Sequence, residues 1–388
     1  MKVVFVSNYF NHHQKPFCEE MYKRLGEDFT FISTSVMREE RKNLGYADDE
    51  QPSYVHLAYE SEQKQHEVIA LIDAADAVIA GSAPEEMLKE RIKAGKLILR
   101  YSERLYKKKV SCLRKLYHAI RFRLMNRRNK KIYMLCASAY TAKDYSDLGM
   151  YKDRTYKWGY FPEVKEYDIN VLISKKKRNT LMWCGRFIDW KHPDDAVKIA
   201  HKLKENGYDF QLNFVGTGIM EEELYRLVDD YDLNDSVHFL GSMPPERVRV
   251  HMEEAEIYLF TSDRQEGWGV VLNESMNSGC AVVASHEIGS VPFLVNDGVN
   301  GLVYHSGDMD ALYEKVRYLL DRHEERERIG RSAYQSIVSE WNAETAAERL
   351  MQLMANKLKG EKYPDLYESG PCSKAQIIQD KCHKESFR

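Results

Sequence analysis

The chain carries two carboxylates, Glu266 and Glu274, where a loop is expected to lead into a helix. Between them, Gly267, Trp268 and Gly269 allow a tight turn. A helix N-terminus presents free backbone N–H groups and the positive end of the peptide dipoles, which suits a phosphate group. A carboxylate before such a helix can bond a sugar, and one in its first turns can bond a ribose diol. The segment therefore indicates nucleotide-sugar recognition, although two ordinary surface glutamates would show the same spacing.

A second segment, residues 181–193, supplies two positive charges after a predicted strand. Gly185 allows the backbone to turn tightly, and Arg186 and Lys191 follow it. Cleavage of a nucleotide sugar builds negative charge on the leaving diphosphate, which fixed cations stabilise. An Arg can fork onto two phosphate oxygens, and a Lys acts as a point charge. The segment thus fits a diphosphate site; the alternative is a pair of surface cations beside acidic neighbours.

Short apolar runs alternate with helical patterns along almost the whole chain. This alternation predicts parallel sheets with both faces covered by helices. A length of 388 residues favours two domains. We expect an α/β protein of two Rossmann-like doubly wound domains, residues 1–165 and 178–340, facing a central ligand cleft. The remaining tail, residues 359–388, is polar and is expected to be flexible or loosely docked.

The segment from Glu266 to Gly279, together with the cations of residues 181–193, resembles the donor-binding signature of retaining glycosyltransferases of the family-four type. Members of that family have the GT-B fold. The resemblance is strong over about 180–304 and only architectural over the first domain. It implies that a last helix, residues 342–358, crosses back to the first domain.

The resemblance also implies roles for individual residues. The positions that it assigns to donor binding are Gly185, Arg186, Lys191, Gly216, Leu240, Glu266, Gly267, Trp268, Gly269 and Glu274. Arg186 and Lys191 would contact the diphosphate. Glu266 would bond the donor-sugar hydroxyls, and Glu274 would grip the ribose with both carboxylate oxygens. The base would be held largely by backbone contacts at Gly216 and Leu240, each of which lies at a predicted strand end.

The chain departs from the family pattern at three places. His192 replaces the usual Gly after Lys191, and Phe293 stands where the family often has Glu. No pair of glycines follows the first strand, so the family's backbone contact to the donor phosphate is not carried over. Neither His192 nor Phe293 removes a charged group from the predicted donor site, whereas the missing glycine pair keeps a non-catalytic binding scaffold open as an alternative.

Polar residues at two strand ends of the first domain are expected to face the cleft. His12 and His13 could bond sugar hydroxyls or the diphosphate, or one could merely cap the following helix. Glu103 could accept a proton from the acceptor hydroxyl, or pair with a neighbouring Arg. The candidate catalytic residues are therefore Glu266, Arg186, Lys191, His12, His13 and Glu103.

Residues 104–131 contain twelve Lys or Arg and no Asp or Glu. Their apolar positions follow helical spacing, which predicts an amphipathic basic helix. Such a helix suits an anionic membrane surface, and an ordinary covering helix is the alternative. Nucleic-acid binding is not expected, because the net charge of the whole chain is -3.

The sequence also bears on the compartment. Seven scattered cysteines without a Cys-x-x-Cys pair favour reduced thiols. No apolar run approaches membrane-spanning length, and the N-terminus lacks the pattern of a signal peptide. We therefore expect a cytoplasmic protein held peripherally at the inner face of the cell membrane.

Two Asp-x-Asp pairs have the spacing that other sugar transferases use to bind a divalent metal. Asp308 and Asp310 begin a predicted helix, where Asp is a common cap, and Asp230 and Asp232 lie in a polar connection. Such spacing is expected by chance in a chain with sixty acidic residues. The cations of residues 181–193 can supply the charge instead, so we predict metal-independent activity with no cofactor beyond the donor.

Together these patterns predict a hexosyltransferase for cell-surface polysaccharide synthesis. Its donor would be a nucleotide diphosphate sugar, with uridine as the expected base, and its acceptor a glycan or a lipid-linked glycan. Retention of configuration rests on the resemblance alone. Two alternatives remain open: a nucleotide-sugar epimerase on a similar scaffold, and a non-catalytic scaffold that binds sugar nucleotides.

Overall fold

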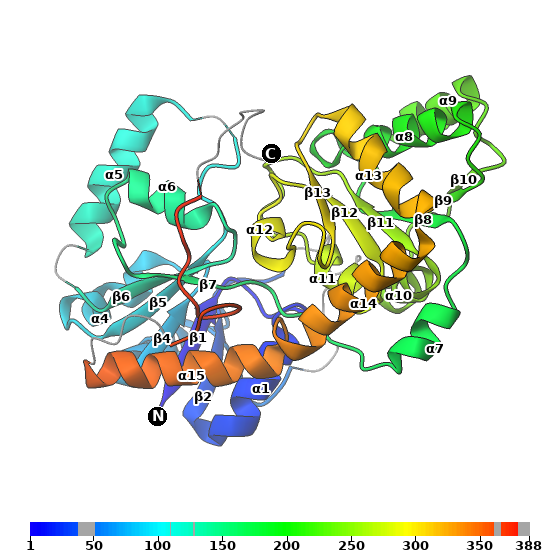
Figure 1. Ribbon diagram of the computed structural model, residues 1–388. Helices are drawn as coiled ribbons and strands as arrows, with labels where there is room; N and C mark the ends of the chain where they lie inside the picture. Colours follow the sequence, from blue (N-terminus) through cyan, green and yellow to red (C-terminus); the bar gives the residue numbers. More distant parts are fainter. Residues whose placement is uncertain (38–50, 109, 127–128, 361–365, 379–388) are drawn as a thin grey trace. The chain divides into compact units, whose positions relative to one another are not determined.

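The computed structural model describes residues 1–37, 51–108, 110–126, 129–360 and 366–378 (Figure 1). The chain divides into two compact units. The first unit comprises residues 1–163 together with residues 340–379, and the second comprises residues 164–339. Residues 342–358, which the resemblance assigns to the first domain, therefore group with the first unit.

The first unit is built on a parallel sheet, which in the described part of the chain has seven strands in the order β3-β2-β1-β4-β5-β6-β7. The strands are β1 (Val3–Ser7), β2 (Phe29–Ser33), β3 (Val55–Leu57), β4 (Ala77–Ala80), β5 (Leu97–Ser102), β6 (Ile132–Cys136) and β7 (Thr155–Lys157). The helices are α1 (Lys15–Leu25), η1 (Gly26–Asp28), α3 (Glu62–Ala74), η2 (Glu85–Leu88), α4 (Lys89–Lys93), α5 (Cys112–Asn126), α6 (Thr141–Asp147) and α15 (Ala343–Lys359). Helix α15 packs along α1.

The second unit contains a parallel sheet with six strands among the described residues, in the order β10-β9-β8-β11-β12-β13. The strands are β8 (Thr180–Cys184), β9 (Gln211–Val215), β10 (Val237–Phe239), β11 (Ile257–Phe260), β12 (Ala281–Ser285) and β13 (Leu302–Tyr304). The helices are α7 (Ile169–Ser174), η3 (Asp189–Lys191), α8 (Pro193–Glu205), α9 (Glu221–Asp230), α10 (Pro245–Glu254), α11 (Val271–Asn277), α12 (Val291–Leu294), α13 (Met309–Asp321) and α14 (His323–Ser339).

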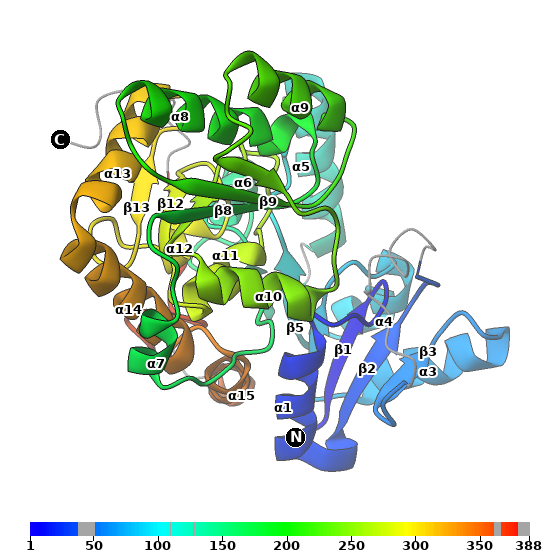
Figure 2. The same ribbon diagram turned by 90° about the vertical axis from the view of Figure 1, so that its right-hand side faces the viewer.

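Helices cover both faces of the second sheet. Figure 2 shows α8 and α9 on one face and α10 and α11 on the other. The strands β11 and β12 of this sheet are buried along their whole length. Trp183, Phe187 and Phe214 pack together in the core of this unit. Continuous apolar strands are what a sheet covered on both faces requires, so the α/β fold expected from the sequence is confirmed.

Both sheets reverse their strand order beside their first strand. In the first unit β1 lies between β2 and β4, and in the second unit β8 lies between β9 and β11. Loops that leave the carboxyl ends of the strands on either side of such a point diverge, which makes room for a ligand. The predicted donor residues follow β8, β9, β10 and β11, and so lie at this edge of the second sheet.

The basic helix predicted over residues 104–131 is shorter in the structure, where α5 spans Cys112–Asn126. The segment before it is held by Asp144, whose carboxylate accepts hydrogen bonds from the backbone N–H groups of Leu105 and Tyr106 at 2.8 Å and 3.3 Å. Those N–H groups are thereby taken out of helical pairing. Residues 109, 127 and 128 of the predicted helix lie outside the described residues.

The tail after residue 359 was expected to be flexible or loosely docked. Its described part instead adds an extended segment to the edge strand β7, because Lys157 N–H donates to Ser373 O at 2.7 Å and Cys372 N–H donates to Lys157 O at 2.8 Å. Cys372 is buried there. The expectation was wrong for residues 366–378, and residues 361–365 and 379–388 lie outside the described part.

Candidate functional site

Glycine turns after three strands of the second sheet contact one another. Gly185 N–H donates to Val215 O at 3.0 Å, and Gly216 N–H donates to Gly241 O at 2.9 Å. Gly216 has a φ of 133°, and a Cβ at this position would lie 1.9 Å from the carbonyl oxygen of Gly185. Only glycine fits such an approach. The turns after β8, β9 and β10 thus form one backbone surface at the carboxyl edge of the sheet.

Lys191 and Glu266 form an ion pair between two neighbouring loops. Lys191 ends η3, whereas Glu266 lies in the loop from β11 to α11. Lys191 Nζ lies 2.5 Å from Glu266 Oε2, and the two side chains are only 12% and 13% exposed. Ser262 Oγ donates to the same carboxylate oxygen at 3.2 Å. The structure thus brings the residue predicted for the diphosphate and the residue predicted for the sugar into direct contact.

Thr261, which the sequence interpretation missed, ties the same two loops together. Its hydroxyl oxygen lies 2.8 Å from the carbonyl oxygen of Lys191 and 2.9 Å from that of His192. It also accepts a hydrogen bond from the indole N–H of Trp183 at 2.8 Å. The only signal in the sequence was its place directly after the buried strand β11. Thr261 therefore holds the backbone from which the lysine of the ion pair extends.

His192 stands where the resemblance leads one to expect glycine, and it adopts the left-handed conformation that glycine favours, with a φ of 48°. Its Nε2 lies 3.6 Å from Asp263 Oδ2 in the β11–α11 loop. The interaction with Asp263 raises the pKa of His192, while burial opposes the rise. The two loops of the ion pair are therefore joined a second time by a histidine that a nearby carboxylate keeps protonated to higher pH.

The turn between the two signature glutamates is fixed by Trp268. Its side chain is buried, and the indole N–H donates to Asn273 Oδ1 in α11 at 2.9 Å. Gly269 has a φ of 82°, and a Cβ there would lie 2.3 Å from the ring of Phe260. Because the tryptophan ring is buried in the core, the turn of residues 267–269 can contact a ligand through its backbone.

Glu274 lies in the first turns of α11. Burial raises the pKa of its carboxyl group, and Arg249 partly opposes the rise. A half-buried carboxylate near a helix N-terminus favours polar partners that replace lost water, and two hydroxyl groups would do so. Glu274 therefore lies where two ribose hydroxyl groups could replace the water that its carboxylate has lost.

Two other predicted donor residues lie at the surface of the same edge. Within the described part of the chain, Arg186 is exposed and forms no ion pair. Leu240, directly after β10, is partly exposed, and its N–H donates to Phe214 O at 2.8 Å. The guanidinium is thus available to an anionic ligand beside the glycine turns.

The acceptor-side candidates gather in the first unit, at the carboxyl edge of its sheet. The rings of His12 and His13 lie 3.8 Å apart, and the ring of His13 lies 6.3 Å from that of Tyr160. Tyr160 donates a hydrogen bond to Glu103 Oε1 at 3.0 Å, and Lys107 Nζ lies 2.5 Å from Glu103 Oε2. Glu103 thus forms an ion pair with Lys107. The sequence interpretation missed Tyr160, which connects the three candidates.

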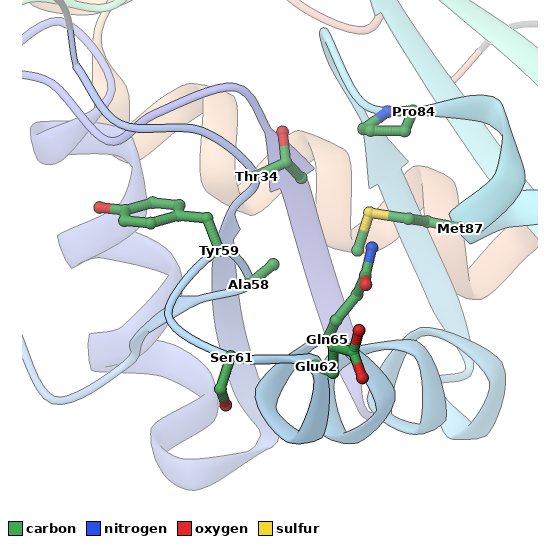
Figure 3. A pocket seen from close by; sticks show the side chains of 8 residues that line it. All are labelled: Thr34, Ala58, Tyr59, Ser61, Glu62, Gln65, Pro84 and Met87. Carbon is green, nitrogen blue, oxygen red and sulfur yellow. The ribbon is translucent and has the colours of Figure 1, made fainter.

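A pocket of about 300 Å³ opens in the first unit beside the carboxyl ends of β2 and β3 (Figure 3). Its lining residues are Thr34, Ala58, Tyr59, Ser61, Glu62, Gln65, Pro84 and Met87. Ser61 caps α3 by accepting a hydrogen bond from Lys64 N–H at 3.1 Å. The lining mixes polar and apolar side chains, and it contains none of the three acceptor-side candidates.

The Asp-x-Asp pair of Asp308 and Asp310 has a structural role. Asp308 caps α13 by accepting a hydrogen bond from Ala311 N–H at 3.0 Å, as the sequence predicted. Asp310 pairs with Lys202 at 2.6 Å. Among the described residues, no group of three or more His, Cys, Asp or Glu side chains is arranged to hold a metal ion. Nor does any helix in those residues combine the length and hydropathy needed to cross a bilayer.

Residues 164–336 match the family described as glycosyl transferases group 1. A curated relative, the amylovoran biosynthesis glycosyltransferase AmsK of Erwinia amylovora, is 29% identical over 197 residues, which is 50% of this chain and 48% of the relative. The GDP-mannose-dependent phosphatidylinositol monomannoside mannosyltransferase of Mycolicibacterium smegmatis is 26% identical over 46% of this chain and 48% of the relative. The match thus spans about half the length of these relatives.

Solved structures cover more of the chain. HepE of Anabaena in complex with UDP superposes with a TM-score of 0.68 and 15% identity, over 92% of this chain and 100% of that protein. Sucrose-phosphate synthase of Thermosynechococcus elongatus gives a TM-score of 0.63, also at 15% identity, over 93% and 100% of the two chains. At such identities the likeness establishes the fold, and it is the GT-B fold.

Gly216→Ala should break the contact between the turns. The new methyl group would meet the carbonyl oxygen of Gly185, so we expect a lower melting temperature and at least about tenfold weaker nucleotide binding. Gly207→Ala is the matched control, because Gly207 also has a positive φ but no atom lies within 4 Å of its Cβ position. Equal effects of both substitutions would show that backbone strain, rather than close approach, sets the requirement.

The pair of His192 and Asp263 should make stability depend on pH. Because the folded-state pKa of His192 is raised, its contribution is fully present below about pH 6.5 and is lost as the pH rises through the folded-state value. Asparagine tolerates the left-handed backbone. We therefore expect His192→Asn to lower the free energy of unfolding more at low pH than at high pH. Urea denaturation at several pH values on both sides of about 6.5 measures the loss of unfolding free energy caused by His192→Asn. If that loss depends on pH equally when Asp263 is replaced by Asn, the pairing is contradicted.

Proposed function

Because residues 164–336 of this chain belong to the group 1 glycosyl transferase family, we propose that the protein is a retaining hexosyltransferase. Its donor is a nucleotide diphosphate sugar, and its acceptor is a glycan or a lipid-linked glycan of a cell-surface polysaccharide. The observation that carries the proposal is the ion pair of Lys191 and Glu266, placed beside the glycine turns where the strand order reverses.

The donor diphosphate lies on the backbone of the glycine turns. Lys191 supplies a positive charge that is shielded from water, and Arg186 supplies an exposed guanidinium that can fork onto phosphate oxygens. Glu266 bonds hydroxyl groups of the sugar, and Glu274 bonds the ribose. In the free protein Lys191 and Glu266 satisfy each other, and the bound donor gives each a partner of its own.

Transfer breaks the bond between the anomeric carbon and the diphosphate oxygen, and forms a bond from that carbon to the acceptor oxygen on the same face. The acceptor proton passes to an oxygen of the departing diphosphate. Lys191 and Arg186 stabilise the negative charge that develops there. The protein cations serve where other transferases use a divalent metal, so the reaction proceeds without one.

The relatives support the choice of substrates. The name of AmsK assigns it to polysaccharide biosynthesis, and the Mycolicibacterium enzyme acts on a phosphatidylinositol mannoside. The HepE complex contains UDP, which favours a uridine donor, while the mannosyltransferase uses GDP-mannose and makes guanosine the competing base. We propose that the protein works in the cytoplasm at the inner face of the membrane, where a lipid-linked acceptor would be met.

We propose that His12, His13 and Glu103, which lie in the first unit, bind the acceptor. Tyr160 and Lys107 both bond Glu103, so its carboxylate is held in one orientation rather than left mobile. In this arrangement Glu103 orients an acceptor hydroxyl. The histidines present ring nitrogens that suit sugar hydroxyls.

Turnover tests the proposal. With UDP- or GDP-hexoses and a panel of glycan and lipid-linked acceptors, we expect release of the nucleoside diphosphate to persist in EDTA. Lys191→Met and Glu266→Gln should each lower kcat by about 10²–10³-fold, the usual loss when one group that stabilises developing charge is removed. Lys198→Met is the matched control, because Lys198 pairs with Asp194 on the exposed side of α8.

Three results would count against parts of this proposal. Wild-type kcat in the Lys191→Met and Glu266→Gln variants would refute the site. Loss of activity in EDTA with rescue by manganese would refute metal independence. Donor binding without transfer to any acceptor would favour a binding scaffold.

A further inference from the structure

Helix α5 of the first unit exposes five large apolar side chains. Their exposed fractions are 80% for Leu113, 57% for Leu116, 60% for Tyr117, 53% for Ile120 and 60% for Leu124. Positions three, four, seven and eleven residues after the first fall on one side of a helix, so the five form a single apolar stripe. A helix on the surface of a folded domain normally turns such a stripe toward the core.

The opposite side of α5 makes the contacts with the rest of the unit. The ring of Phe122 lies 6.0 Å from that of Tyr145 in α6, and the ring of His118 lies 6.2 Å from that of Tyr106. Figure 1 shows α5 beside α6. The helix is therefore anchored by its less apolar side, while the apolar stripe of Leu113, Leu116, Tyr117, Ile120 and Leu124 faces away from these contacts.

The charges around the apolar stripe have one sign. Arg114 and Arg121 are exposed and lie seven residues apart, along one flank of the stripe. Lys108 before the helix and Lys130 after it are also exposed. The whole segment 104–131 contains no Asp or Glu. An apolar surface whose own segment carries cations and no acids fits a partner that offers an apolar interior beneath a layer of negative charge.

We propose that α5 lies in the plane of an anionic phospholipid bilayer, with the apolar stripe inserted at the boundary between headgroups and acyl chains. Arg114 and Arg121 would contact the lipid phosphates. A helix of 15 residues is about 22 Å long, too short to cross a hydrocarbon core of about 30 Å but long enough to lie along its surface. The proposal extends the proposed function, because it names the surface at which a lipid-linked acceptor would be met.

A second copy of the chain fits the apolar stripe less well. In a symmetric dimer the same patch of each copy meets the other. Two segments that each carry twelve Lys or Arg and no acid would then lie against each other. Like charges at such short range oppose association. A bilayer with anionic headgroups removes that repulsion.

Sedimentation of the full chain with vesicles tests the proposal. At physiological ionic strength we expect binding to vesicles of phosphatidylcholine with phosphatidylglycerol, and much weaker binding to phosphatidylcholine alone. The triple variant Leu116→Ser/Ile120→Ser/Leu124→Ser should lower partitioning into the mixed vesicles by at least about tenfold. Arg114→Gln/Arg121→Gln should lower it by about tenfold as well and reduce its dependence on salt.

Matched controls separate insertion from general surface effects. Leu71→Ser in α3 and Val171→Ser in α7 also remove exposed apolar side chains, and both variants should bind vesicles like the wild type. All substitutions are at exposed positions, so unchanged melting temperatures should show that the variants fold.

The proposal is overturned if the wild type ignores the mixed vesicles or if the triple variant binds them equally well. It is also overturned if ultracentrifugation shows self-association through the stripe and no vesicle binding. Nucleotide binding is read separately, and its absence in a protein that still binds vesicles would refute the proposed function while leaving this inference intact.

Discussion

The close approach of the glycine turns after β8, β9 and β10 is the constraint on which the rest of the second unit depends. The turns share backbone hydrogen bonds, and Gly216 fits only because no side chain stands between it and Gly185. Strand order reverses at β8, so these turns lie beside the loop that leaves β11. The side chains of the β11–α11 loop, including the carboxylate of Glu266, are therefore held close to the glycine turns.

The ion pair follows from that placement. Lys191 and Glu266 meet because Thr261 holds the backbone of one loop against the other, and His192 and Asp263 join the loops a second time. Two nearly desolvated charges of opposite sign compensate each other, and neither could remain buried alone without a large cost. The arrangement keeps a cation and an anion ready at one edge, which is what a negatively charged diphosphate joined to a sugar requires.

The α/β fold and the glycine turns could be predicted from the sequence, because the strands are continuous apolar runs and the turns contain the glycines that tight turns need. The residues predicted for the donor site follow strand ends, which is where ligands of such sheets bind. Thr261 escaped notice since a threonine after a strand has no distinctive pattern. Its importance arises from two carbonyl groups about seventy residues away in the chain, at Lys191 and His192.

Contacts remote in sequence also explain the other differences. The predicted basic helix begins later than its periodicity suggests, because the carboxylate of Asp144 binds the backbone ahead of it. Residues 366–378 belong to a tail that is polar and mixed in charge as a whole, yet they dock because β7 is the edge strand of its sheet. The direction in which α5 turns its apolar stripe depends on two aromatic contacts, with Tyr145 and Tyr106, that helical periodicity alone does not specify.

The most direct test of the account is calorimetric titration of UDP and GDP into the full chain in the presence of EDTA, repeated with Glu274→Ala. The account predicts that one of the two nucleotides binds without metal. The variant should bind it at least about tenfold more weakly, because charge-assisted hydrogen bonds to the ribose contribute about 1.5–3 kcal/mol each. If neither nucleotide binds the wild type, or if the variant binds as tightly, the second unit does not hold a nucleotide in the way described.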